Sequence, residues 1–254
     1  MINKLYFSPT GSTKKVVNII GDTFSGEKRS LDFSVANVDY TVNCFENEDI
    51  CVIGVPSFGG RVPAVALERL MQMTAKATPT IIIASYGNRD YDDTLLELKD
   101  ALTANGFLVV AAIAAVTQHS IMPQFGADRP SLEDEQILQG FASKIKSVLE
   151  SGDALCQVSL SGNTPYREYN GLPLKPKADS SCSKCGVCAK VCPVGAIPLD
   201  DPSATLKDRC ITCMRCVSVC PSQSRKLNSL LLFAATQKMK KACATPKQNS
   251  LYLG

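Results

Sequence analysis

Short apolar runs alternate with longer amphipathic stretches over roughly the first 150 residues of the chain. Five apolar, β-branched-rich runs predict strands, at residues 2–7, 29–35, 49–55, 79–85 and 107–116. Four stretches with apolar residues at three- and four-residue spacing predict helices, at residues 13–24, 63–75, 91–106 and 131–152. Gly106 is expected to end the third of these helices. The pattern leaves open whether residues 36–48 hold a short helix or none.

This alternation is typical of α/β proteins, in which a parallel sheet carries helices on both faces. Five strands within residues 1–150 fit a five-stranded, doubly wound parallel sheet of order 2-1-3-4-5. Ligands of such sheets bind at the carboxyl ends of the strands. We therefore expect an α/β domain at residues 1–150 with its ligand site at that edge.

The composition changes beyond this domain. Residues 151–178 are rich in Gly, Pro, Ser and Asn, and they predict an extended linker packed on the surface. A cysteine-rich segment follows at residues 179–226, and we expect residues 227–254 to form a helical tail. The stretch 227–243 predicts an amphipathic helix with a basic end, whose apolar part is too short to span a bilayer. We expect this helix to pack on the first domain, with a membrane surface or a partner protein as the alternatives.

The overall composition narrows the class of protein. The formal charge of +3 is spread along the chain apart from a lysine-rich patch near residues 238–247, so nucleic-acid binding has little support. The N-terminus lacks a secretory signal, and no apolar run approaches the roughly 20 residues of a membrane span. These features predict a cytoplasmic protein with no transmembrane segment. The 12 cysteines of such a chain argue for metal or redox chemistry rather than structural disulfides.

Eight of the cysteines form one pattern twice, C-x2-C-x2-C-x3-C-P, starting at Cys182 and again at Cys210. This is the bacterial ferredoxin run, in which three cysteines hold one 4Fe-4S cluster and the fourth ligates the other. The rule defines a first cysteine set, Cys182, Cys185, Cys188 and Cys220, and a second cysteine set, Cys210, Cys213, Cys216 and Cys192. Zinc is the alternative, but zinc sites typically use two CxxC pairs about 15 to 20 residues apart. The segment 179–226 resembles two-cluster 4Fe-4S ferredoxins, although its second half ends in SQSR where the first has VGAI.

The other four cysteines have no ligand spacing, and we interpret them as core or surface thiols. They are Cys44, Cys51, Cys156 and Cys243.

Three loops follow predicted strands one, three and four: SPTGST at residues 8–13, PSFGGRVP at 56–63 and YGNRDYDD at 86–93. All three should emerge at the carboxyl edge of the sheet. The hydroxyls of the first loop and the amides that open the next helix suit a phosphate dianion, with an ordinary Ser/Thr helix cap as the alternative. A triphosphate loop is disfavoured, because the nearest Walker match, from Gly54, lacks the lysine and the Ser/Thr. The dinucleotide pattern GxGxxG is also absent.

Together with the cysteine repeat, these loops resemble fusions of a flavodoxin-like domain to a two-cluster ferredoxin, over nearly the whole chain. The resemblance implies FMN in a flavodoxin-like domain and two 4Fe-4S clusters in a small C-terminal α+β domain of the bacterial ferredoxin type. It assigns the FMN phosphate to Ser8, Thr10, Gly11, Ser12 and Thr13. It assigns the flavin ring to Pro56, Ser57, Phe58, Gly59, Gly60, Tyr86, Gly87, Asn88, Arg89 and Tyr91.

Within that set, Phe58 and either Tyr91 or Tyr86 are the aromatic candidates for ring contact, since the chain has no tryptophan. Gly59 and Gly60 resemble the glycines whose free peptide turns its carbonyl toward the reduced ring. Asn88 and Arg89 are candidates for its pyrimidine edge.

His119 is the only histidine, and it follows the fifth predicted strand. Two roles remain equally open for His119: it lies near the flavin or a cluster, or it has a purely structural role. No Ser-His-Asp or metal-histidine pattern marks it as catalytic.

Three functions fit these features. The first is an electron carrier in which FMN and two 4Fe-4S clusters exchange electrons with each other and with external redox proteins. The second is an enzyme whose flavin reduces a small molecule with electrons from its own ferredoxin domain. The third is a redox sensor or scaffold that has clusters but an empty flavin site.

Overall fold

The computed structural model describes all 254 residues. Five parallel strands form the centre of the first domain: β1 (Ile2–Tyr6), β2 (Lys28–Asp32), β4 (Ile50–Pro56), β6 (Thr78–Tyr86) and β7 (Phe107–Val116). They lie in the order β2-β1-β4-β6-β7. Numbered along the chain this is 2-1-3-4-5, the flavodoxin-like order, so the predicted α/β fold class is confirmed.

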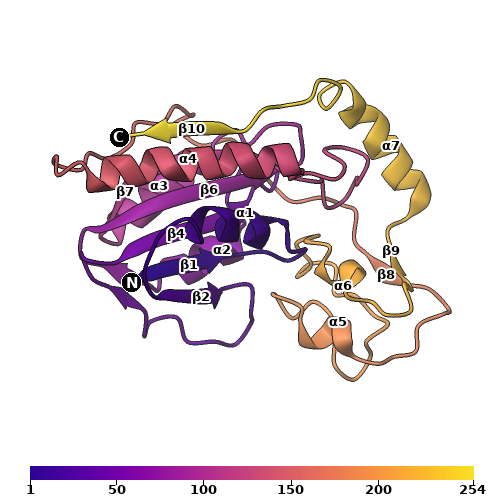
Figure 1. Cartoon of the computed structure of the whole chain (residues 1–254). Coiled ribbons are helices and arrows are strands. Elements are labelled where there is room, and N and C mark those ends of the chain that lie inside the picture. Colours follow the sequence, from indigo (N-terminus) through magenta and orange to yellow (C-terminus); the bar gives the residue numbers. More distant parts are fainter.

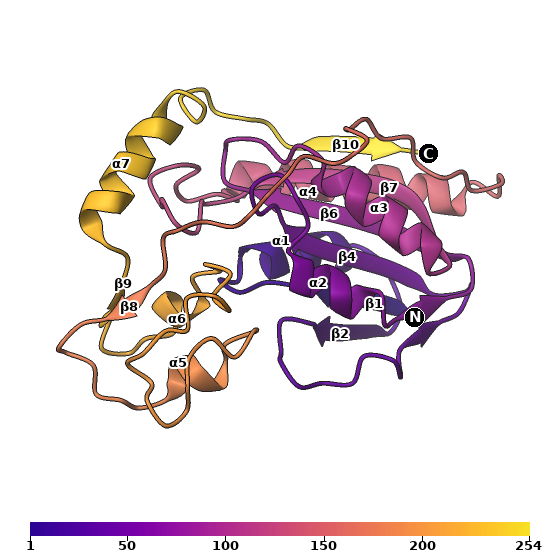
Figure 2. The same cartoon turned by 180° about the vertical axis from the view of Figure 1, so that it is seen from behind.

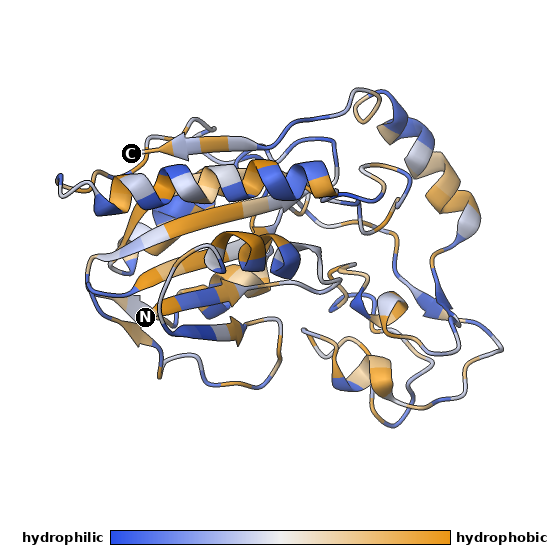
Figure 3. Ribbon diagram, in the orientation of Figure 1, coloured by the Kyte–Doolittle hydropathy of each residue, from blue (hydrophilic) through white to orange (hydrophobic).

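Helices cover both faces of this sheet. α1 (Ser12–Gly21) and α4 (Leu132–Glu150) pack on one face, as Figure 1 shows, and α2 (Ala64–Leu70) and α3 (Thr94–Ala104) pack on the other, as Figure 2 shows. Because helices exclude water from both faces, the inner strands read as continuous apolar runs rather than as alternating ones. Figure 3 shows these apolar strands in orange beneath helices with hydrophilic outward residues.

The second crossover contains no helix. Its chain instead contributes the short strand β3 (Cys44–Phe45), which pairs with β5 (Thr74–Ala75). This pairing ends the helix predicted for residues 63–75 early, at Leu70, because the amides of Thr74 and Ala75 donate to Asn43 and Asn105 instead of to helix carbonyls. Gly106, left-handed at φ +87°, follows the end of α3 as predicted.

The tail contains a strand that the sequence analysis missed. The expected helix is present as α7 (Ser229–Lys240), but β10 (Ser250–Leu253) then pairs antiparallel with β7. The sheet therefore has six strands rather than five, and residues 227–254 are not wholly helical. Four residues are too few for a period-two pattern to be recognised, whereas the open edge of β7 offers them unpaired backbone groups.

The cysteine-rich segment lies beyond the carboxyl ends of the parallel strands (Figures 1 and 2). It holds two short helices, α5 (Val187–Lys190) and α6 (Arg215–Ser218), and a small antiparallel pair, β8 (Lys177–Ala178) with β9 (Arg225–Lys226). Residues 177 and 178, which we predicted to be linker, thus belong to this segment. Arg69 of α2 donates to the carbonyl oxygen of Pro193 at 2.6 Å and links the segment to the first domain.

Only one side of the tail helix α7 packs against the rest of the protein. Leu232, Ala235 and Met239 of α7 pack against a small cluster formed by Ile121, Met122 and Met214. Leu230 and Phe233 on its other side are 78% and 64% exposed. Figure 3 shows the apolar first half and the hydrophilic second half of this helix. No helix in the chain is both long and apolar enough to cross a membrane.

Candidate functional site

A cavity opens where the carboxyl ends of the strands face the cysteine-rich segment. Nine of the predicted FMN-binding residues line it: Thr10, Ser12, Thr13, Pro56, Ser57, Phe58, Gly59, Tyr86 and Gly87. The other lining residues had not been assigned to the site: Pro9, Ser85, Thr117, Gln118, His119, Ser120, Ile121, Tyr169, Leu172, Ile211, Thr212 and Cys213.

The first loop has free amides beside this cavity, which Thr10, Ser12 and Thr13 line and Gly11 does not. The backbone N–H groups of Gly11, Ser12 and Thr13 make no hydrogen bond within the protein. Gly11 is left-handed at φ +93°, and a β-carbon there would meet nothing within 4 Å. Unpaired amides at the start of a ten-residue helix, beside the hydroxyls of Thr10 and Ser12, form a suitable site for a phosphate dianion.

Ser8 and Thr13 have structural partners in this loop. The Ser8 hydroxyl accepts from the amide of Lys14 at 2.9 Å and so caps α1, whose N-cap residue Gly11 has no side chain to do so. Thr13 shares a 2.7 Å hydrogen bond with Ser85 at the end of β6. The helix-cap alternative therefore describes Ser8, which lies outside the cavity, and leaves the helix-opening amides free.

The second loop is a tight turn in which Phe58 and Arg61 exchange backbone hydrogen bonds of 2.9 and 3.2 Å. Gly59 is left-handed at φ +61°, and a β-carbon there would overlap the ring of Tyr169. Gly60 lies behind the cavity wall, where a β-carbon would overlap Asp92. Phe58 and Tyr169 are thus the aromatic side chains that the two halves of the chain bring to this end of the cavity.

Asn88, Arg89 and Tyr91 of the third loop do not line the cavity. Asn88 donates to the carbonyl oxygens of Cys243 and Thr245 at 2.9 and 3.2 Å, so its side chain holds the tail. Tyr91 shares a 2.6 Å hydrogen bond with Tyr252 of β10. The sequence assigns all three to the flavin ring because of their position in the loop. It does not reveal that the C-terminal tail returns to this loop and binds the side chains of Asn88 and Tyr91.

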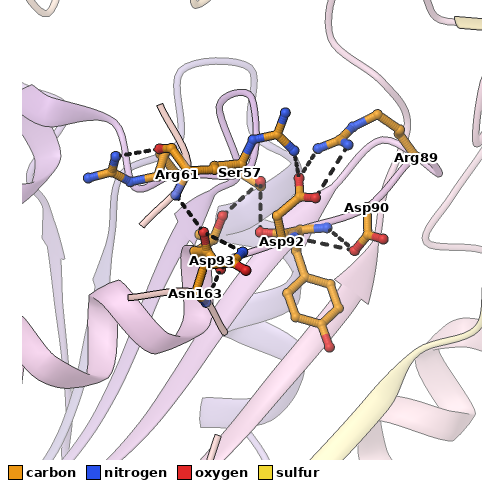
Figure 4. Close-up of polar contacts among 10 residues, drawn as sticks. Ser57, Arg61, Arg89, Asp90, Asp92, Asp93 and Asn163 are labelled. Atoms are coloured by element: carbon orange, nitrogen blue, oxygen red, sulfur yellow. Dashed lines mark hydrogen bonds and ion pairs between the residues drawn. The ribbon is translucent and has the colours of Figure 1, made fainter. Parts of the chain in front are cut away.

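A network of polar contacts joins the second and third loops to the linker, as Figure 4 shows. Asp93 accepts from the amides of Asn163 and Arg167 at 2.8 and 2.7 Å. Burial acts to raise the pKa of Asp93, but these hydrogen bonds hold its pKa below the usual value. Asp92 pairs with Arg89 and with Arg167. The network fixes the stretch that leads to Tyr169 against the domain that holds the cavity.

His119 lines the same cavity from the loop after β7. Its Nδ1 accepts from the amides of Ile121 and Met122, both at 3.2 Å, so the proton of the neutral ring resides on Nε2. Burial, together with the nearby charge of Arg89, lowers the pKa of His119 to about 4. The side chain is therefore a neutral hydrogen-bond donor at neutral pH.

The eight motif cysteines surround two further cavities. One is lined by the first cysteine set, and the other is lined by the second cysteine set. Each cavity thus receives three cysteines from one repeat and the fourth from the other. No three side chains of Cys, His, Asp or Glu converge closely enough for a single metal ion. Soft sulfur donors spaced around a cavity suit a cluster several atoms across.

The thiols of these cavities differ in their surroundings. Burial raises the pKa of Cys213 to about 12 and that of Cys216 to about 11. Burial acts in the same direction on Cys220, but hydrogen bonds from Ser224 and Ser222 and from backbone amides lower its pKa to about 6. All 12 cysteines are free of disulfides, and Cys51 and Cys243 are buried as the core interpretation requires.

One ligand candidate borders two of the three cavities. Cys213 lines the large cavity at the strand ends and also the cavity of the second cysteine set. Its neighbours Ile211 and Thr212 do the same. The stretch 211–213 is thus the wall between the two sites. Sequence spacing predicts Cys213 as a ligand, but only the folded chain shows that this residue also lines the cavity at the strand ends.

Residues 181–224 match the family of 4Fe-4S dicluster domains. The chain thus joins a flavodoxin-like domain to a 4Fe-4S dicluster segment. This combination confirms the resemblance to flavodoxin–ferredoxin fusions inferred from the sequence.

Among solved structures the first domain of this fusion is similar to two flavodoxins. One, from the domain Archaea, is 14% identical at a TM-score of 0.43, with 59% of this chain and 98% of that chain covered. Flavodoxin 1 of Bacillus cereus is 14% identical at a TM-score of 0.44, with 57% and 97% covered. The fold assignment rests on the strand order and not on these scores. A comparison with curated proteins found no match to this chain.

Proposed function

We propose that this protein is an electron carrier that binds FMN at the strand ends and two 4Fe-4S clusters in its cysteine-rich segment. The observation that carries the proposal is the position of Cys213, which lines both the large cavity and the cavity of the second cysteine set. FMN, when bound, would supply exchange between one- and two-electron chemistry, and each cluster would supply one-electron transfer.

The residues of the large cavity support FMN as its ligand. The free amides of Gly11, Ser12 and Thr13, with the hydroxyls of Thr10 and Ser12, would hold the phosphate. Phe58 and Tyr169 would bound the ring, and the neutral His119 would offer it an Nε2–H donor. The apolar Ile211 and Leu172 would keep water from the wall that faces the second cysteine set.

The two cysteine cavities support two clusters rather than one. Each is lined by four cysteines, three from one repeat and one from the other. The cavity next to FMN belongs to the second cysteine set, so the first cysteine set lies farther along the segment, where Cys185 is exposed. This exposed end would face the external redox donor or acceptor. Twelve cysteines without a disulfide also suit the reducing cytoplasm, where we propose that the protein works.

The composition of the anaerobically purified full chain tests the proposal. One FMN and about eight irons per chain are expected. Flavin-free protein that does not bind added FMN, or protein with well under eight irons after cluster reconstitution, contradicts it.

The shared wall can be tested with a matched pair of variants. Cys213→Ser and Cys185→Ser each alter one ligand, but only Cys213 borders the large cavity. Cys213→Ser is therefore expected to change the absorption and fluorescence of bound FMN, whereas Cys185→Ser leaves them unchanged. Equal effects of the two variants on the flavin spectra would count against contact between the sites.

A further inference from the structure

Arg225 is a buried cation beside the first cysteine set. It is 1% exposed, and its Nε donates to the Sγ of Cys188 at 3.2 Å. It lies in the SQSR stretch, where the second repeat departs from the VGAI of the first. The guanidinium also donates to the hydroxyl of Thr205 at 2.9 Å and to the carbonyl oxygens of Pro202 and Ala204. These contacts hold the side chain firmly in one orientation.

No carboxylate forms a direct ion pair with Arg225, and the charge of Asp201 acts on it only at longer range. The acidic residues nearby, Asp179 and Asp201, pair with the exposed Lys226 and Lys184 instead. A buried charge without a partner is costly, since the protein interior solvates it poorly. The group that can carry negative charge in direct contact with Arg225 is the first cysteine set, whose sulfurs become thiolates when they ligate metal. The residue is thus placed to interact with an anionic group in that cavity.

The two cysteine sets differ in their hydrogen-bond donors. In the first set the sulfur of Cys188 accepts from Arg225, and that of Cys220 lies 3.3 Å from the hydroxyl of Ser224. In the second set the sulfur of Cys192 accepts from the amide of Ala196 at 3.2 Å, and no side chain donates to any of its sulfurs. Apolar residues dominate the second cavity, among them Val194, Ile197 and Ile211.

This asymmetry affects the reduction potential of a cluster. A positive charge and a hydrogen bond to a ligating sulfur both stabilise the form that has gained an electron. The charge of Arg225 also acts on Cys216 of the second set, but it makes no hydrogen bond there. The first set should therefore respond more strongly to Arg225 than the second set.

We propose that Arg225 is a positioning residue that raises the reduction potential of the cluster held by Cys182, Cys185, Cys188 and Cys220 above that of the other cluster. The inference rests on the proposed function, because it requires both clusters. Its consequence is that an electron shared between the clusters resides mainly on the one farther from the FMN cavity.

The test is an anaerobic titration of the full chain with dithionite and mediators, followed by EPR. Arg225→Gln removes the charge, and Lys226→Gln is the matched control, since it removes the same charge from the next residue, which is exposed. Arg225→Gln is expected to lower the potential of one cluster, with about a tenfold fall in its reduced-to-oxidised ratio at the wild-type midpoint, or about 59 mV. Lys226→Gln should leave both potentials unchanged.

The affected cluster is identified with ligand variants. Cys185→Ser marks the first set and Cys210→Ser the second, so Arg225→Gln should move the transition that Cys185→Ser alters. If the Arg225→Gln protein does not retain the first cluster, the titration uses Arg225→Lys instead. This variant keeps the positive charge but loses the hydrogen bond to Cys188, so a smaller fall in the same potential is expected. An unchanged potential, or an equal shift of both clusters, overturns the inference. Wild-type protein without two clusters would instead overturn the proposed function.

Discussion

The ring of Tyr169 packs directly on Gly59, leaving no room for a β-carbon on that glycine. The two residues are far apart in the sequence, since Gly59 follows β4 and Tyr169 lies in the linker. Both line the cavity proposed for FMN. The linker is therefore part of the wall of the site rather than a passive connection.

Gly59→Ala is expected to weaken FMN binding at least tenfold. The new methyl group would displace Tyr169, and the left-handed backbone at φ +61° adds about 1 to 2 kcal/mol of strain. Gly171→Ala is the matched control, because Gly171 is also left-handed but has open space around it. Fluorescence titration with FMN measures the effect, and equal affinities of the two variants would argue against a role of the Tyr169 contact.

Thr10→Ala combined with Thr13→Ala is expected to release FMN while both cysteine sets keep their metal. Both residues line the cavity next to the free amides of the first loop. Because Thr13 also bonds to Ser85, Ser85→Ala serves as a control that breaks this bond alone. Flavin and iron analyses of the purified variants give the result. If the double variant retains one FMN per chain, the first loop acts only as a helix cap and does not bind the phosphate.

His119 is expected to make stability depend on pH between about 6.5 and 4. Burial lowers its pKa to about 4 in the folded chain, against an ordinary value near 6.5. The unfolded chain therefore binds a proton in this range that the folded chain does not, and stability is full above pH 6.5 and falls as the pH drops toward 4. The total loss is of the order of 3 kcal/mol.

The measurement is urea unfolding of the wild type and of His119→Asn at several pH values. The chain has no other histidine, so the slope between pH 6.5 and 5 should be largely absent in His119→Asn. A direct check is the single imidazole signal in the NMR spectrum, which should titrate near pH 4. Titration near pH 6.5 would show that the ring is solvated.

Asn249→Ala is expected to lower the free energy of unfolding by about 2 to 3 kcal/mol. Its side chain accepts from the amide of Val116 at 2.8 Å and donates to Asp134 at 2.7 Å, and both bonds are buried. Asn228→Ala, which removes only the cap of α7, should cost about 1 kcal/mol. Urea unfolding compares the two variants, and a loss no larger than that of the control would show that the tail adds little to the sheet.

The parts of the fold that the sequence predicted well are those with local periodicity. The strands Ile50–Pro56 and Phe107–Val116 are long apolar runs, and the helix Leu132–Glu150 repeats its apolar residues every three or four positions. The strand Ser250–Leu253 has no such signature, because it is defined by the edge of β7 and by the bonds of Asn249. Tertiary contacts of this kind leave no regular pattern in the sequence.

The candidate site divides in the same way. The cysteine spacing and the first loop are local motifs, and they led directly to the residues that line the three cavities. Tyr169 and Ile211 reach the large cavity from the linker and from the cysteine-rich segment, well beyond the loops at the strand ends, so no motif could reveal them. Asn88 and Tyr91 are the opposite case. Their position in the third loop predicted contact with the flavin, but their side chains form hydrogen bonds with the C-terminal tail instead.

The antiparallel strand β10 has a consequence for the order in which the molecule can assemble. It follows the cysteine-rich segment in the chain, yet it completes the sheet of the first domain. A ribosome must therefore translate all eight motif cysteines before the sheet can close along β7. Until then that edge remains open to pairing with other chains. Loading of the cysteines during synthesis would thus take place on a protein whose first domain is still unfinished.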